Sequence, residues 1–134
     1  AADPGMTGLV ILQLILGALY RHMISDPELA AKATHVLYAH IAVAVLVLVF
    51  AVIIGLRLVG RENVTLKKCG LSVLILVGVQ LLLGGGALIA VLLRDGTEIP
   101  LIEVLVTTAH QANGALLLGA SFATYAWVKR MIST

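Results

Sequence analysis

The sequence has 134 residues, of which 60% are hydrophobic and only 12% are charged, and its net charge is +2. Its mean hydropathy of +1.08 is too apolar for the surface of a soluble domain of this length. The few basic residues form no stripe with interleaved aromatic residues, which argues against a nucleic-acid partner. A single cysteine excludes a disulfide within the chain.

Four apolar segments follow one another along the chain, and each is long enough to cross about 30 Å of hydrocarbon as a helix. They cover residues 6–23, 34–58, 71–93 and 101–128. Because the segments are long and show no alternation of polar and apolar residues, helices are favoured over a barrel. We therefore expect an all-α integral membrane protein, in which residues 1–134 form a single four-transmembrane-helix bundle in a lipid bilayer.

Turn and capping residues predict where these helices begin. Asp26 followed by Pro27 is typical of an N-cap and a first helical position, which predicts that the second helix starts at about residue 27. Pro100 is expected to open the fourth helix after a turn at residues 94–97. Residues 60–68 are expected to link the two halves of the chain.

The charged residues of the loops predict the orientation in the membrane. One side of the predicted bundle carries six basic residues, namely Arg57, Arg61, Lys67, Lys68, Lys129 and Arg130. The opposite side mixes three basic residues with a larger number of acidic ones. By the positive-inside rule, both termini are expected in the cytoplasm, with the protein in the plasma or inner membrane.

A repeated pattern relates the two halves of the sequence. Seventy positions separate His40 from His110, and the same shift aligns Ala39 with Ala109 and Leu46 with Leu116. In the first and third segments, Gln13 and Gly17 recur as Gln80 and Gly84. The pattern predicts two helical hairpins, at about residues 6–58 and 71–128, related by a two-fold axis along the membrane normal.

The two repeated histidines are the candidate functional residues. In an up-down bundle the second and fourth helices lie on a diagonal, so His40 and His110 are expected to face each other near the outer leaflet. Opposed neutral imidazoles suit the two axial positions of a haem iron. Zinc or copper fits less well, because no Cys, Asp or third His lies within helical reach at that depth.

Small residues near the histidines predict space for a flat macrocycle. Gly114 and Ala44 come one turn after the histidines, and Gly17 and Gly84 recur on the flanking helices. The alternative is that small residues simply let membrane helices pack closely, and that a membrane histidine bonds a neighbouring helix. The repetition of both histidines with matching flanks favours the ligand interpretation.

Other polar residues each allow more than one interpretation. Arg21 pairs with a haem propionate or extends to the membrane interface. Gln13 and Gln80 orient a ligand or hydrogen-bond across the bundle. Glu103 acts as a general base or is a solvated carboxylate near the loop. His22 and His35 contribute a propionate contact, a proton relay or a transient metal site, or are simply exposed at the interface.

The order of these motifs resembles one four-helix half of the haem A synthase family. The pattern Gln-x-x-Leu-Gly-Ala-x-x-Arg of that family is similar to residues 13–21, and the second hairpin is similar through Gln80, Gly84 and residues 108–118. The resemblance implies a b-type haem held by His40 and His110, in a protein tied to the oxidation of haem O to haem A for terminal oxidases.

Leu37 and Thr107 stand where the family's active half carries a Glu one turn before a ligand histidine. We therefore expect the cofactor-binding half, suited to electron transfer, with a second copy or a second homologous half as a partner and with a redox partner that the sequence does not identify. Two alternatives from other classes stay open. One is a cytochrome b or a haem-binding anchor subunit of a respiratory complex, and the other is a structural assembly protein without a cofactor.

Overall fold

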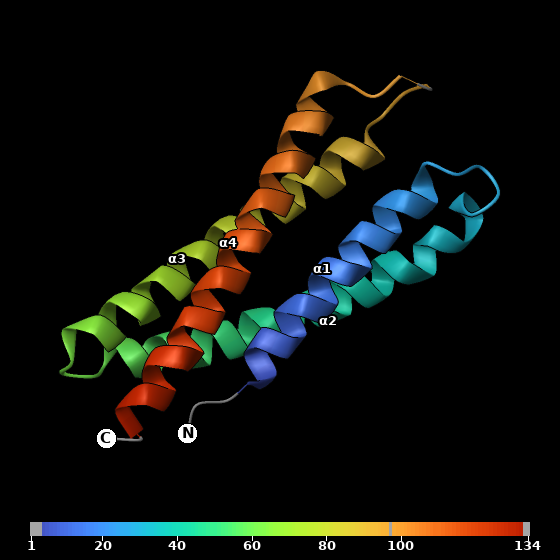
Figure 1. Cartoon of the computed structure of the whole chain (residues 1–134). Helices are drawn as coiled ribbons and strands as arrows, with labels where there is room; N and C mark the ends of the chain where they lie inside the picture. The colour runs from blue at the N-terminus through green and yellow to red at the C-terminus, as the bar shows by residue number, and fades with distance from the viewer. Residues whose placement is uncertain (1–3, 97, 133–134) are drawn as a thin grey trace.

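The computed structural model describes residues 4–96 and 98–132, which form four long antiparallel helices (Figure 1). The helices are α1 (Gly5–Ile24), α2 (Ala30–Val59), α3 (Val64–Leu92) and α4 (Leu101–Ile132). Each of the four is long and apolar enough to cross a membrane. The predicted all-α, four-helix membrane bundle is thereby confirmed.

Each helix packs against two others, in the ring order α1, α2, α3, α4 and back to α1. Consequently α2 and α4 lie on a diagonal, as the repeat predicts. Figure 1 shows the α1–α2 and α3–α4 connections at one end of the bundle, called the hairpin-loop end below. Both termini and the α2–α3 connection lie at the other end, called the terminal end (Figure 1).

The interior of the bundle is built from residues spaced alternately by three and four positions. In α4 this row consists of Glu103, Thr107, His110, Gly114, Leu117, Ser121, Thr124 and Val128, all buried or half-buried. Such a seven-residue repeat keeps one stripe of a helix against its neighbours, as in left-handed coiled coils. The residues seventy positions earlier, in α2, are also all buried or half-buried. The repeat therefore extends to the inward faces of the helices.

The connection between the two hairpins is shorter than the sequence predicts. The helix α3 begins at Val64, because the Asn63 side-chain oxygen accepts the backbone N–H groups of Thr65, at 3.0 Å, and Leu66, at 3.1 Å. This is a regular N-cap. The predicted link over residues 60–68 is wrong beyond Asn63, since the polar residues that follow form the first turns of α3.

The start of α2 also differs from the prediction. Pro27 lies in a turn, and α2 begins at Ala30, whose N–H donates to the Asp26 carbonyl oxygen at 2.9 Å. The Asp26 carboxylate accepts the N–H of Glu28, which makes it a turn residue. The prediction for Pro100 is confirmed, because α4 begins at the next residue. Thr97, in the predicted turn before it, lies outside the described residues.

The two hairpins meet closely where α2 packs on α3 near the terminal end. A Cβ atom added to Gly70 would lie 2.6 Å from the carbonyl oxygen of Gly55 and 2.8 Å from the Cβ of Leu58. The two backbones are therefore in direct contact, as small residues allow between membrane helices. This contact anchors the hairpins to each other on the side of the bundle opposite α1 and α4.

Candidate functional site

The imidazoles of His40, from α2, and His110, from α4, meet inside the bundle. Their ring centroids are 6.2 Å apart and their planes are inclined by 80°. Both residues are half-buried. The diagonal placement of α2 and α4 thus brings together the two histidines that the alignment pairs.

Each imidazole lies against a glycine of the other helix in its own hairpin. A Cβ atom on Gly17 would lie 3.1 Å from Cε1 of His40, and one on Gly84 would lie 3.0 Å from Cε1 of His110. The two hairpins therefore repeat the same contact. These glycines make room for the histidine rings themselves, which is a more direct role than the space for a macrocycle that the sequence suggests.

The ring nitrogens are incompletely paired. The amide nitrogen of Gln13 donates to Nε2 of His40 over 3.2 Å. Among the described residues, the buried Nδ1 atoms of His40 and His110 have no hydrogen-bond partner, and neither has the Oε1 atom of Gln13. Buried polar atoms are normally paired, so these three atoms in one place are available to bind another group.

The two glutamines of the repeat have different partners. The Oε1 atom of Gln80 accepts a hydrogen bond of 2.7 Å from Nδ2 of Asn113, which also donates to the carbonyl oxygen of Leu76 at 3.0 Å. The first hairpin has Val43 at the position of Asn113, and a valine cannot hold Gln13 in this way. Gln13 is consequently free to reach His40.

A cavity of about 350 Å³ adjoins both histidines. Its lining consists of Gln13, Leu14, Gly17, Ala18, His40, Gln80, His110 and Gln111. Leu14, Ala18 and Gln111 were not predicted, although each is adjacent to Gln13, Gly17 or His110 in the sequence. Exposed Ala18 and Gln111 show that the cavity opens between α1 and α4.

Three of the four predicted small residues do not line this cavity. A Cβ atom on Gly114 would lie 3.0 Å from Cδ2 of Leu14 and 3.2 Å from Nε2 of Gln80, so side chains of α1 and α3 already cover it. Ala44 is half-buried one turn after His40 and is also absent from the lining. Gly84 contacts His110 but is not among the residues that line the cavity.

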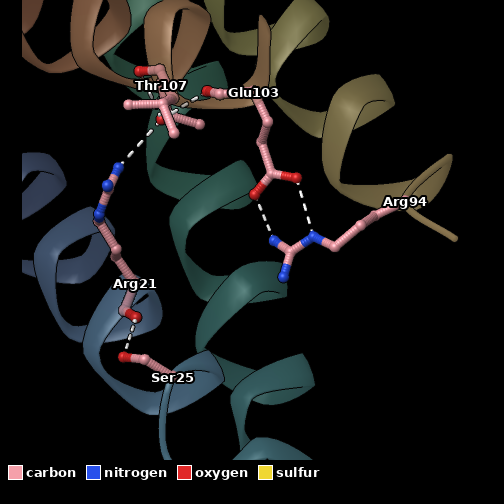
Figure 2. Close-up of polar contacts among 6 residues, drawn as sticks. Arg21, Ser25, Arg94, Glu103 and Thr107 are labelled. Carbon is pink, nitrogen blue, oxygen red and sulfur yellow. Dashed lines mark hydrogen bonds and ion pairs between the residues drawn. The ribbon is translucent and has the colours of Figure 1, made fainter. Parts of the chain in front are cut away.

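Arg21 lies in a second pocket, of about 170 Å³, at the hairpin-loop end (Figure 2). Its Nη1 atom donates to Oγ1 of Thr107 at 3.0 Å. Arg94 forms a two-pronged ion pair with Glu103, in which Nε donates to Oε2 at 2.8 Å and Nη2 donates to Oε1. Glu103 is only 5% exposed, so it is neither a solvated carboxylate nor an unpaired base.

The remaining histidines lie apart from these pockets. His22 and His35 are exposed, which agrees with the simplest of the interpretations considered for them. Within residues 4–96 and 98–132, no three His, Cys, Asp or Glu residues gather in a way that could hold a metal ion.

Comparisons of the chain with models of protein families, with curated protein sequences and with solved structures find no match. The function is therefore argued from the residues and their geometry.

Proposed function

We propose that this protein is a membrane b-type haem protein in which His40 and His110 are the axial ligands of one iron, and that it transfers electrons. The observation that carries the proposal is the 6.2 Å separation of the two imidazole rings across the bundle. A metal–nitrogen bond of about 2 Å on each side, added to ring radii of about 1 Å, gives roughly 6 Å between the centres of two rings that share one metal.

The surroundings of the two histidines support a flat ligand. Both Nδ1 atoms are buried without a partner, and the adjoining cavity already has a volume of about 350 Å³. The cavity opens between α1 and α4, so a macrocycle larger than this volume can extend towards the lipid. Porphyrin supplies the four equatorial nitrogens itself, and for this reason two histidines suffice where other metals need three or four protein ligands.

Electron transfer is the chemistry that this ligand set favours. With imidazoles in both axial positions, bound haem supplies reversible one-electron chemistry and leaves no coordination position for oxygen. None of the residues that line the cavity is a carboxylate, and Leu37 and Thr107 precede the histidines by one turn. The chain's own contribution is to fix the two rings and to surround them with uncharged side chains.

The resemblance to haem A synthase adds a narrower proposal, which is that this chain corresponds to the cofactor-binding half of such an enzyme. Its electrons would then serve the oxidation of haem O to haem A in a second copy or a homologous half. The orientation proposed from the loop charges places the termini in the cytoplasm and the haem near the outer leaflet of the plasma or inner membrane. A carrier or anchor subunit of a respiratory complex is the second candidate, favoured by the lack of a carboxylate in the lining.

The proposal is tested by the absorption spectrum of the purified protein. His40→Ala and His110→Ala should each abolish the low-spin haem bands, because one axial ligand is then missing. The matched controls His22→Ala and His35→Ala, which alter exposed histidines, should keep most of the absorption. Low-spin bands that persist in both ligand variants would overturn the assignment.

The two candidate roles are separated by incubating the protein with haem O, molecular oxygen as the oxidant and an electron donor, and identifying the extracted porphyrin by chromatography. Conversion to haem A supports the synthase role. Unchanged haem O, from protein that shows a reversible bis-histidine spectrum, supports the electron carrier. A pyridine haemochrome spectrum of the purified protein identifies the resident haem type.

A further inference from the structure

The pocket around Arg21 lies directly beside the histidine cavity, towards the hairpin-loop end. Arg21 follows Gly17 by one turn in α1, and Thr107 precedes His110 by one turn in α4. At about 1.5 Å per residue, the two pockets are displaced by roughly 5–6 Å along the helices. Both pockets have lining residues in α1 and α4, so a side arm that extends one helical turn from a ligand in the histidine cavity would reach Arg21.

The charges that line this pocket do not cancel. Arg94 is neutralised by its two hydrogen bonds to buried Glu103. Arg21 contacts the neutral hydroxyl group of Thr107, and no other carboxylate lines the pocket among the described residues. Two arginines against one glutamate leave a net charge of +1, which corresponds to one carboxylate group.

Thr107 fixes the direction of the Arg21 side chain. Its hydroxyl donates to the carbonyl oxygens of its own helix, at 2.7 Å to Glu103 and 3.2 Å to Val104, and therefore offers a lone pair to Arg21 (Figure 2). This bond spans from α1 to α4 and leaves most of the five guanidinium N–H donors available. A guanidinium with spare donors is well suited to a two-pronged contact with a carboxylate.

We infer that Arg21 binds a carboxylate of the ligand, with Thr107 as a positioning residue and the Arg94–Glu103 pair as the neutral wall of the pocket. The inference rests on the proposed function and deepens it. It orients the tetrapyrrole with its propionate edge towards the hairpin-loop end, and it decides between the two interpretations that the sequence leaves open for Arg21.

The inference is tested by titrating the haem-free full chain with iron protoporphyrin IX and with its dimethyl ester, in which the carboxylates are neutral. Wild-type protein should bind the free acid about tenfold or more tightly than the ester, as expected for one charge-assisted contact. Arg21→Gln should remove this preference by weakening binding of the free acid alone. Thr107→Val should reduce the preference without abolishing it, because the arginine charge remains.

Arg57→Gln is the matched control, because it removes the same charge from an exposed residue at the terminal end. It should retain the preference for the free acid. Two results would overturn the inference: equal affinity of the wild-type protein for the two pigments, or an Arg21→Gln variant that binds both pigments more weakly by the same factor. In either case a low-spin spectrum would still support the proposed function. Absence of a low-spin spectrum with either pigment overturns the proposed function itself, and the inference with it.

Discussion

At the scale of single residues, Gly17 and Gly84 decide where the imidazoles lie. Each leaves a gap that Cε1 of a histidine fills at 3.0–3.1 Å from the position of a Cβ atom. Any larger residue must push the ring aside. If the imidazoles bind a metal as proposed, such a displacement would weaken ligation, because a metal–imidazole bond tolerates only a few tenths of an ångström around about 2 Å.

Gly17→Val and Gly84→Val are therefore expected to lower haem affinity by about tenfold or more, in line with the cost of overpacking a filled site. The affinity is measured by titration of the Soret band. Gly78→Val and Gly85→Val are matched controls, since nothing lies within 4 Å of a Cβ atom at either position. An unchanged affinity in both test variants would show that the rings are not held by these glycines.

The two glutamines have different partners because the two halves of the repeat differ at one position, Val43 in the first and Asn113 in the second. Gln80 accepts a hydrogen bond from Asn113, whereas the first hairpin has Val43 at the equivalent position, and Gln13 donates to His40. The two repeated histidines therefore lie beside glutamines with different hydrogen-bond partners, although the motifs that carry them are alike. If the histidines hold a haem iron as proposed, this difference would tune its redox chemistry, because hydrogen bonds around a ligand histidine change its basicity.

At the scale of helices, the contact between α2 and α3 decides how closely the hairpins approach. Gly55 and Gly70 allow backbone-to-backbone contact near the terminal end. In lipid, no hydrophobic effect drives helices together, so close packing of this kind supplies much of the association energy.

Gly70→Ala should lower the stability of the bundle by about 1–3 kcal/mol, because the new methyl group meets backbone atoms that cannot move independently. Thermal unfolding in detergent, followed by circular dichroism, measures the loss. Gly78→Ala, on the same helix with open space around it, should leave the midpoint unchanged or raise it slightly. Equal midpoints for the two variants would show that the α2–α3 contact is not tight.

At the scale of the whole molecule, the two ends of the bundle differ in charge. Arg57, Arg61, Lys67 and Lys68 lie at the terminal end with Lys129 and Arg130, whereas the hairpin-loop end contains most of the acidic residues. Basic loops are retained in the cytoplasm during insertion. We therefore propose that the Arg21 pocket lies on the outer side of the membrane.

The orientation is checked with a membrane-impermeant maleimide. Cys69, partly exposed in the second turn of α3, should be labelled in inside-out membranes and protected in intact cells. Ser25→Cys in a Cys69→Ser background should show the opposite pattern, because Ser25 is exposed at the hairpin-loop end. Labelling of Cys69 from the outside would reverse the proposed topology.

The sequence by itself determined the fold class, the helices and the pairing of the histidines. Long apolar runs in water-free surroundings leave only helices as an option, and a repeat with matched flanks must place equivalent residues at equal depth. The start of α3 escaped prediction because hydropathy does not register an N-cap such as Asn63, which extends a helix through polar residues.

Only the tertiary structure decided which side chains meet across the bundle. Gly114 is covered by Leu14 and Gln80, and Glu103 is buried against Arg94, although spacing along α4 alone suggested open space and a solvated carboxylate. Such contacts depend on the rotation of each helix about its axis and on side chains from other helices. Periodicity within one helix carries information on its inward face, whereas the identity of the partner is set by packing between helices.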